Sequence, residues 1–433
     1  MNSRYSLLLS AMCTAITLAA QVFTLILALS NAAYANDEPV EKSVKVAIQV
    51  GDGKHRVFIK QVLGEFERRY PNIAYELIVL RDVQRYPLMV EEWLAKGEGP
   101  DIIYWYAGQR IKHFQDMGQL QDISAFWSKN KLDQAFPKAV VDSIKIDNKA
   151  WAIPVTYFLW ALYYREHSFK RLGLAVPTTW AETLHACKKF RENGIDLFAF
   201  GSKTAWASHA WFDYINLRLN GLSFYRDLLA GRIAYTDDRV KLALRYWRQL
   251  LDNECFNANY SSYTVWQAFP RVLHGLSAMT LADGVPQIDM PREIRDDIRM
   301  AYFPEITEAM PRYTVAPVNV FMVPAYTRMR PELEKMLMFL ASPEFQASFN
   351  APISRPAALI TADRGSDVLA QETFQAIASS PGGIQYLDRD TDIRFANKTP
   401  AILVDFMQHR DVDKTAKDLE SLRKEIFGPL LKK

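Results

Sequence analysis

The stretch Gly97-Glu98-Gly99-Pro100-Asp101-Ile102-Ile103-Tyr104-Trp105 shows how this chain is built. Two glycines and a proline within four residues end a preceding helix and form a turn. The apolar run that follows, 102–105, has the length and composition of a buried strand. The stretch therefore predicts a helix, a tight turn and a core strand in immediate succession.

Strands and helices alternate on the amino-terminal side of this stretch as well. The segment 44–50 is rich in β-branched residues and alternates in polarity, which predicts a strand. Apolar residues at helical spacing over 57–70 predict a helix that ends at Pro71. A strand at 74–80 and a helix at 90–96 follow. This alternation indicates an α/β fold in which a mostly parallel sheet is covered by helices.

The remainder of the chain adds further elements of both kinds. Thr179 and Glu182 form the pattern of a capping box, which predicts a helix that begins at Trp180. A short strand at 276–281 is expected to end at Asp283-Gly284, and later segments are mainly helical. The absence of an internal repeat in the sequence excludes a solenoid.

Length and composition indicate a large globular protein. The chain has 433 residues, of which 49% are hydrophobic and 23% charged. A single core of that size is unusual, so two lobes are expected. The formal net charge is only +3 and is not gathered in long runs, so there is no electrostatic argument for a nucleic-acid partner.

The amino terminus has the pattern of an export signal. Arg4 precedes an apolar run from Leu7 to Leu29, and Ala33-Tyr34-Ala35 forms an A-x-A site before Asn36. We therefore expect a cleavable signal peptide at 1–35 and a mature protein in the periplasm. The apolar run is also long enough to span a bilayer, so a retained anchor is the alternative.

No motif of a metal site, a cofactor site or a catalytic site stands out. The seven histidines are scattered, and isolated surface or capping roles fit them better than metal binding. Gly51-Asp52-Gly53-Lys54 lacks the other residues of a phosphate-binding loop. Cys187 and Cys255 fit either a disulfide or two separate buried thiols. We expect no cofactor, no metal and no enzymatic activity.

Aromatic residues are abundant, at 12% of the chain, and several lie in predicted loops or at strand ends. Aromatic rings pack on the flat C–H faces of sugars, while charged and amide groups bind sugar hydroxyls. Such residues beside Asp, Arg and Gln favour a carbohydrate cleft. The group consists of Tyr104, Trp105, Tyr106, Tyr157, Phe158, Trp160, Trp206 and Trp211.

An ordered series of motifs resembles the family 1 extracellular solute-binding proteins of ABC importers, the family that includes maltose-binding protein. The resemblance covers nearly the whole mature chain. It rests on Phe66-Glu67-x-x-Tyr70-Pro71-Asn72-Ile73, the stretch 97–105, Ala152-Ile153-Pro154 with Tyr163-Tyr164-Arg165, Pro177-Thr178-Thr179-Trp180, Gly275-Leu276-Ser277-Ala278-Met279 and Ser342-Pro343-Glu344-Phe345-Gln346.

The resemblance implies a two-lobe binding protein of type II, in which each lobe is a mostly parallel sheet flanked by helices and hinge crossings join the lobes. We expect lobe 1 to comprise 36–155 and 269–318. Lobe 2 is expected to comprise 156–268 and 319–433, including the C-terminal helices. The lobes of such a protein close on a small-molecule ligand, here a sugar or oligosaccharide, and the expected partners of this monomer are ABC permease subunits.

The resemblance also implies ligand contacts. Asp52 and Trp105 are expected to face the cleft, with Gln109 and Arg110 at neighbouring polar positions and Tyr157 and Phe158 after the crossing proline. Tyr106, Trp206 and Asp283 complete the predicted site. Val285-Pro286 and Asp405-Phe406 depart from the family pattern of aromatic residues, which argues against maltodextrins specifically and leaves a charged sugar open.

Two other functions stay open at this point. A periplasmic sensor would present its bound ligand to a membrane receptor or kinase. A periplasmic carbohydrate enzyme would need a positioned acid and base, and the sequence offers no identifiable pair.

Overall fold

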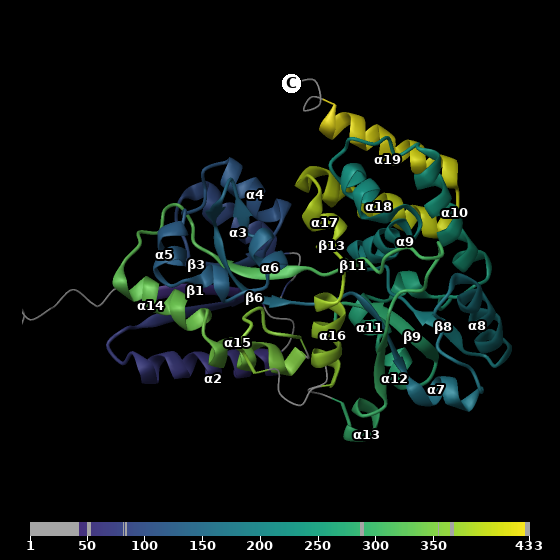
Figure 1. Cartoon of the computed structure of the whole chain (residues 1–433), viewed down its shortest axis with the longest axis horizontal. Coiled ribbons are helices and arrows are strands. Elements are labelled where there is room, and N and C mark those ends of the chain that lie inside the picture. Colours follow the sequence, from purple (N-terminus) through teal and green to yellow (C-terminus); the bar gives the residue numbers. More distant parts are fainter. Residues whose placement is uncertain are drawn as a thin grey trace, which may run out of the picture.

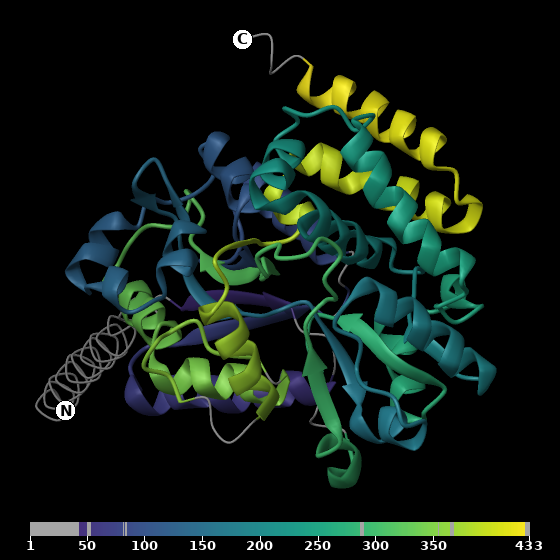
Figure 2. The same ribbon diagram turned by 45° about the vertical axis from the view of Figure 1, so that its right-hand side comes forward.

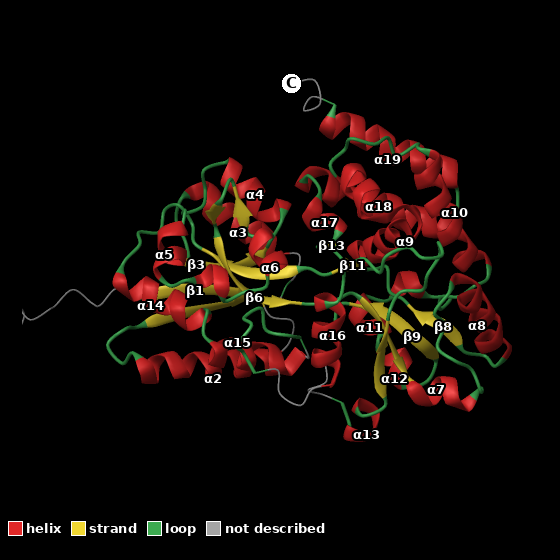
Figure 3. Cartoon of the chain, viewed as in Figure 1, coloured by secondary structure: helices red, strands yellow, loops and turns green. Residues whose placement is uncertain are grey.

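The apolar run after Pro100 is strand β3 (Ile102–Tyr106), and it lies in the middle of the first of two main sheets. The computed structural model describes residues 43–49, 53–80, 82, 85–285, 290–353, 355–363 and 368–428. These residues form two lobes that lie side by side, each with a sheet between helices (Figures 1 and 3). Asp52 and the predicted signal segment 1–35 lie outside the described residues.

The sheet of lobe 1 has the strand order β2-β1-β3-β12-β6. Its strands are almost entirely apolar, and the side chains of β6 and β12 are buried on both faces because helices cover both sides of the sheet. Besides β3, the strands are β1 (Val44–Gln49), β2 (Tyr75–Leu80), β6 (Ala152–Tyr157) and β12 (Val318–Met322).

Lobe 1 contains helices from two separate parts of the chain. They are α2 (Gly53–Arg69), α3 (Arg85–Lys96), α4 (Gln109–Asp116), α5 (Ser124–Lys129), η1 (Leu132–Gln134), α6 (Lys138–Asp142), α14 (Pro331–Leu340), α15 (Pro343–Asn350) and η5 (Ala351–Ile353), with a small ladder of β4 (Lys145–Ile146) and β5 (Lys149–Ala150).

The sheet of lobe 2 has the order β10-β7-β9-β8. Its strands are β7 (Ala161–Arg165), β8 (Asp196–Ala199), β9 (Ser277–Ala282) and β10 (Ile298–Ala301), and a separate pair is formed by β11 (Thr314–Val315) and β13 (Gly383–Ile384).

Most of the helices belong to lobe 2. They are α7 (Glu166–Arg171), α8 (Trp180–Glu192), η2 (Ala205–Ala207), α9 (Ser208–Leu229), α10 (Asp238–Asp252), η3 (Tyr260–Ser262), α11 (Val265–Ala268), α12 (Pro270–Leu273), α13 (Arg292–Arg295), α16 (Val368–Ala378), α17 (Leu387–Asp390), α18 (Ile393–His409) and α19 (Val412–Phe427). Helices α9, α10, α18 and α19 pack together at the far end of this lobe (Figures 1 and 2).

Local signals placed several of these elements correctly. Helix α8 begins at Trp180, and Thr179 and Glu182 form both hydrogen bonds of the predicted capping box. The predicted strand at 276–281 is β9, displaced by one residue. In these places the residues next to each other in sequence are sufficient to determine the backbone conformation.

The prediction of mostly parallel sheets is confirmed, with one exception in each sheet, β12 in lobe 1 and β7 in lobe 2. Strand β1 is parallel to β2 and β3, but β12 runs antiparallel to both β3 and β6. In lobe 2, β7 is antiparallel to β9 and β10, and β8 and β9 are parallel. The two exceptions follow from connectivity, because β12 and β7 enter their sheets from the other lobe, need no helical crossover and so need not be parallel.

The predicted lobe boundaries need correction after residue 268. Strands β9 and β10 pair with β7 and β8, so most of 269–318 belongs to lobe 2 and not to lobe 1. Strand β12 pairs with β3 and β6, and α14 and α15 pack on that sheet, so the early part of 319–433 belongs to lobe 1. The chain crosses between the lobes at 158–160, at 316–317 and between α15 and α16.

Each lobe has its own apolar core, and the core of lobe 2 includes a disulfide between Cys187 of α8 and Cys255. Their Cα atoms are 5.1 Å apart, and 68 residues separate them in sequence. Among the described residues, no helix is both long enough and apolar enough to cross a membrane.

We predict that replacing both cysteines (C187A with C255A) lowers the free energy of unfolding by about 2–4 kcal/mol, because the bridge restricts a long loop in the unfolded chain. Urea unfolding measures the difference. A reducing agent should shift the midpoint of the wild-type protein and leave the double variant unchanged. The prediction would be contradicted if the wild-type protein and the double variant, each with and without the reducing agent, all had the same urea midpoint.

Candidate functional site

A cavity of about 500 Å³ lies between the two lobes. Lobe 1 contributes the start of α3, the end of β3 and the start of α4. Lobe 2 contributes the segment before α9, the end of β9, α17 and α18. Of the predicted site residues, five line this cavity: Tyr106, Arg110, Phe158, Trp206 and Asp283.

The crossing segments form a wall with different residues on its two faces. Phe158 and Pro317 line the interlobe cavity, whereas Tyr157, Ala316 and Val318 line a second cavity of about 630 Å³. This follows from extended backbone, in which successive side chains point to opposite faces. Residues that are adjacent in sequence therefore line different cavities.

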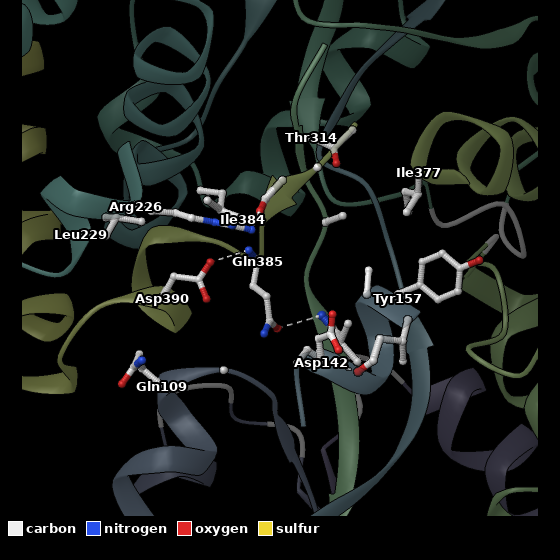
Figure 4. A pocket seen from close by; sticks show the side chains of 18 of the residues that line it. Gln109, Asp142, Tyr157, Arg226, Leu229, Thr314, Ile377, Ile384, Gln385 and Asp390 are labelled. Atoms are coloured by element: carbon white, nitrogen blue, oxygen red, sulfur yellow. Dashed lines mark hydrogen bonds between the residues drawn. The ribbon is translucent and has the colours of Figure 1, made fainter. Parts of the chain in front are cut away.

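Two of the predicted residues, Gln109 and Tyr157, line the second cavity and not the first. Figure 4 shows them around this space together with Arg226, Gln385 and Asp390. The Gln385 backbone N–H donates to Asp390 at 2.7 Å, and its side-chain oxygen accepts from the Val318 N–H at 3.2 Å. The second of these contacts joins lobe 2 to lobe 1 beside the crossing.

Trp105 does not face the cavity, so its predicted role as a cleft residue is wrong for this structure. Its side chain is completely buried in the core of lobe 1, between Tyr86 of α3 and Phe114 of α4. The indole N–H donates to the backbone oxygen of Arg110 at 3.4 Å. Trp105 points to the helix-covered face of β3, while Tyr106, one residue further, reaches the cavity.

Aromatic rings form one wall of the interlobe cavity. Trp160 stacks on Tyr386 with ring centroids 5.1 Å apart, and Trp206 stands nearly perpendicular to both. The Tyr386 hydroxyl donates to the backbone oxygen of Trp206 at 2.6 Å, which holds the Trp206 segment in place. Trp160 and Tyr386 are buried, whereas Trp206 is partly exposed.

Arginines cross the lobe boundary in both directions. Arg110 of α4 in lobe 1 donates through Nε to the backbone oxygen of Asp388 at 2.8 Å, and its Nη2 lies 3.5 Å from the Asp388 carboxylate. Arg355, which follows α15 in lobe 1, pairs with Asp283 after β9 at 2.7 Å. Its guanidinium also lies 4.0 Å from the centroid of the Phe158 ring.

Arg389 reaches in the opposite direction, from α17 in lobe 2 to the sheet of lobe 1. Its Nη1 donates to the Asn319 side-chain oxygen at 2.8 Å and to the Val318 backbone oxygen at 3.2 Å. The guanidinium lies 4.4 Å from the centroid of the Tyr106 ring. Burial lowers the pKa of Arg389, so these contacts compensate for the desolvation of its charge.

Helix α17 is held in position by a buried carboxylate. Asp213 of α9 accepts hydrogen bonds from the Tyr225 hydroxyl and from the Leu387 backbone N–H, the latter at 3.2 Å. Burial raises the pKa of Asp213 well above its ordinary value. Burial also raises the pKa of Asp390, at the other end of α17, to about 6. Carboxyl groups thus lie at both ends of the segment that carries Asp388 and Arg389.

His209 of α9 is another residue, besides Trp105, whose position differs from the prediction. It was grouped with isolated surface or capping histidines, yet its ring is completely buried and lines the interlobe cavity. Burial lowers its pKa to about 4, so the ring is neutral at physiological pH. No spacing signal marks this residue, because its environment is formed by α17 and α18, far away in sequence.

Trp160, Tyr386, Asp388 and Arg389 also line the cavity and were not among the predicted site residues. Trp160 belonged to the predicted aromatic group, and that signal was sufficient to find it. The others lie in 386–389, which carries no recognisable motif. In the part of the chain that the structure describes, no group of three or more His, Cys, Asp or Glu side chains is arranged to bind a metal ion.

Comparison with known proteins identifies the family. The model of the bacterial extracellular solute-binding proteins matches residues 52–347, more than half of the chain. The chain belongs to this family, as its motif series indicated.

Individual relatives are distant. An uncharacterized ABC transporter extracellular-binding protein of Pyrococcus horikoshii, PH1214, is 23% identical over 222 residues, 50% of each chain. The multiple sugar-binding protein of Streptococcus mutans is 22% identical over 183 residues, 42% of each chain. The chain spans about half the length of the curated relatives that it matches.

The same fold occurs in solved structures. The bacterial solute receptor AcbH, described as having an exclusive preference for β-D-galactopyranose, superposes with a TM-score of 0.82 at 19% identity. The match covers 89% of this chain and 99% of that one. It confirms the two-lobe α/β architecture.

We predict that Arg389→Met separates the lobes, because it removes both hydrogen bonds to β12 and leaves the Asn319 side-chain oxygen without a donor. A buried acceptor left without its donor costs about 1–3 kcal/mol, which weakens the contact between the lobes. Small-angle scattering should show a larger radius of gyration than for the wild-type protein. Arg394→Met is the matched control, since Arg394 is exposed and pairs with Asp392 of the same lobe. Identical scattering from both variants would contradict the prediction.

We also predict that Asp390→Asn stabilises the protein increasingly as the pH rises. A raised folded-state pKa means that the proton on Asp390 stabilises the folded form, and this stabilisation is lost as the pH rises through about 6. An asparagine keeps the acceptor for Gln385 without the charge. The advantage of the variant in urea unfolding should grow by about 1 kcal/mol between pH 5 and pH 8. A difference in free energy of unfolding between the variant and the wild-type protein that stays constant with pH would contradict the prediction.

Proposed function

We propose that this chain is the substrate-binding component of an ABC importer and that it holds a sugar or oligosaccharide in the interlobe cavity. The observation that carries the proposal is the composition of the cavity wall. Both lobes contribute to it, and aromatic rings lie beside carboxylates and guanidiniums. A ligand that touches both lobes stabilises the closed arrangement, which is the basis of hinge closure.

The aromatic wall favours a sugar because a pyranose presents an apolar C–H face to a ring and hydroxyls at its rim. Trp206 is the ring best placed to stack on a ligand. Arg389 covers Tyr106, Arg355 covers Phe158, and Trp160 and Tyr386 cover each other. Trp206 is partly exposed and meets its aromatic neighbours through perpendicular contacts.

The names of its relatives support the same proposal. The Streptococcus mutans relative is a multiple sugar-binding protein, and the receptor AcbH prefers a galactopyranose. Membership of an extracellular family agrees with export by the predicted signal peptide at 1–35 and action in the periplasm. The partners would be the permease subunits of the importer, with the binding protein acting as a monomer.

Binding without catalysis is the accompanying expectation. Asp283 and Asp388 are carboxylates of the cavity, and each pairs with an arginine. A general acid must present its carboxyl oxygen to the glycosidic oxygen of the substrate, and in each of these two residues a carboxylate oxygen already faces a guanidinium. The same pairs orient the carboxylates to accept hydrogen bonds from sugar hydroxyls.

We predict that a cognate sugar raises the melting temperature, since a ligand bound only by the folded protein stabilises it by about 2.7 kcal/mol at one hundred times its dissociation constant. A panel of mono- and oligosaccharides in a thermal-shift assay finds the ligand, and calorimetry measures its affinity. A panel without any stabilising sugar would contradict the proposal.

Two tryptophan variants separate the cavity from the core. Trp206→Ala should weaken binding of the identified sugar by roughly 10- to 100-fold, because a stacking surface is lost, and leave unfolding nearly unchanged. Trp105→Ala should instead lower the free energy of unfolding by about 3–5 kcal/mol, as for other large buried residues. If Trp105→Ala instead weakened sugar binding and Trp206→Ala instead lowered the free energy of unfolding, the ligand would bind on the other face of β3.

A further inference from the structure

His209 presents an unused hydrogen-bond acceptor at the interlobe cavity. Its Nε2 lies 2.9 Å from the Thr399 hydroxyl oxygen, and the hydroxyl itself donates to the Ala396 backbone oxygen at 3.2 Å. Because a hydroxyl has only one hydrogen, Thr399 must accept from His209 Nε2–H. A neutral imidazole carries one hydrogen, so Nδ1 has none and can only accept. This buried atom has no partner among the described residues.

Asp388 presents a second acceptor of this kind. One oxygen of its carboxylate, Oδ2, lies 3.5 Å from Arg110 Nη2. The other, Oδ1, is buried and has no hydrogen-bond partner in the described part of the chain. Arg389 Nε lies 3.9 Å from it, which is beyond hydrogen-bond distance. Both Asp388 and His209 line the interlobe cavity.

Glu91 of α3 adds a third acceptor from the opposite lobe. It lines the same cavity and is partly exposed. Its side chain makes no ion pair or hydrogen bond with any residue that the structure describes. Acceptors without donors therefore face the cavity from α3, α9 and α17.

The guanidinium groups around the cavity, in contrast, already donate hydrogen bonds to acceptors of the protein. Arg110 donates to the Asp388 backbone oxygen and Arg389 to the Asn319 side-chain oxygen, both across the lobe boundary, and Arg355 pairs with Asp283. At His209 Nδ1, Asp388 Oδ1 and Glu91, an acidic group on a ligand would meet acceptors to which it cannot donate a hydrogen bond. A buried acceptor left without a donor is costly, and sites built to pair with a hydroxyl or N–H reject analogues that lack it.

We propose that His209 Nδ1 and Asp388 Oδ1 accept hydrogen bonds from O–H or N–H groups of the ligand, and that with Glu91 they select neutral or amine-bearing sugars against acidic ones. This inference rests on the proposed function, since it takes the cavity to be the sugar site. Thr399 is a positioning residue, because it fixes which nitrogen of His209 carries the hydrogen.

The first test compares sugars that share ring configuration and linkage and differ in their neutral, amino or carboxylate substituents. Glucose, glucosamine and glucuronate form one matched set, galactose, galactosamine and galacturonate a second, and cellobiose, chitosan dimer and cellobiouronate a third. In thermal-shift and calorimetric assays, a neutral or amino member should bind at least about tenfold more tightly than its acidic counterpart. An acidic member that binds as tightly or more tightly overturns the inference. If no sugar in the three sets binds, the proposed function is contradicted, and the inference is contradicted with it.

The second test uses variants with the best ligand of the panel. His209→Phe keeps a flat ring but removes the acceptor, and it should weaken binding roughly 10- to 100-fold. His409→Phe is the control, because His409 is exposed on α18 and its ring pairs with Asp405. Thr399→Val removes the acceptor that keeps the hydrogen of His209 on Nε2. It should weaken binding less than His209→Phe does, because Nδ1 can still accept when it carries no hydrogen. Wild-type affinity in His209→Phe contradicts the role of His209.

Two further variants keep the proposal testable if His209→Phe does not fold. Asp388→Asn replaces one acceptor oxygen with a donor at nearly constant size, and Glu91→Gln changes a partly exposed side chain with little risk to folding. Each should narrow the difference in affinity between a neutral sugar and its acidic counterpart, by roughly threefold or more. Unchanged discrimination in both variants overturns the inference.

Discussion

The buried guanidinium of Arg389 is the constraint on which the arrangement of the lobes depends. A charge removed from water needs hydrogen-bond acceptors, and α17 alone does not supply enough of them. Asn319 and the Val318 carbonyl of lobe 1 supply them. Arg110 meets the equivalent need in the other direction, through Asp388. Each lobe thus completes the polar contacts of the other, and the cavity lies where these contacts meet.

The crossing segments explain why the cavity draws on distant parts of the chain. Because the chain passes repeatedly between the lobes, each sheet contains strands from both sides of a crossing, and β12 lies between β3 and β6. The alternation of side chains along 157–158 and 316–318 then assigns neighbours to opposite faces. A shift of one residue in these segments would exchange the walls of the two cavities.

Local patterns were enough to predict β3, α8 and β9, because turn residues, caps and alternation act over a few residues. They could not predict that β9 and β10 pair in lobe 2, since pairing partners are distant in sequence. Trp105 shows a related limit: an aromatic residue at a strand end looks the same whether its face meets a cavity or α3 and α4. His209, Asp388 and Arg389 acquire their roles only through tertiary contacts, so no spacing reveals them. Asp52 lies outside the described residues, and its role stays a prediction.

The central claim is that one ligand is held by both lobes in the interlobe cavity, and hydrogen–deuterium exchange with a saturating sugar tests it most directly. The account predicts that the sugar slows exchange in both lobes, in 106–110 of lobe 1 and in 204–209 and 386–397 of lobe 2. It predicts no comparable change in 139–146, which lines only the second cavity. Protection confined to one lobe, or centred on 139–146 and 382–384, would contradict the account.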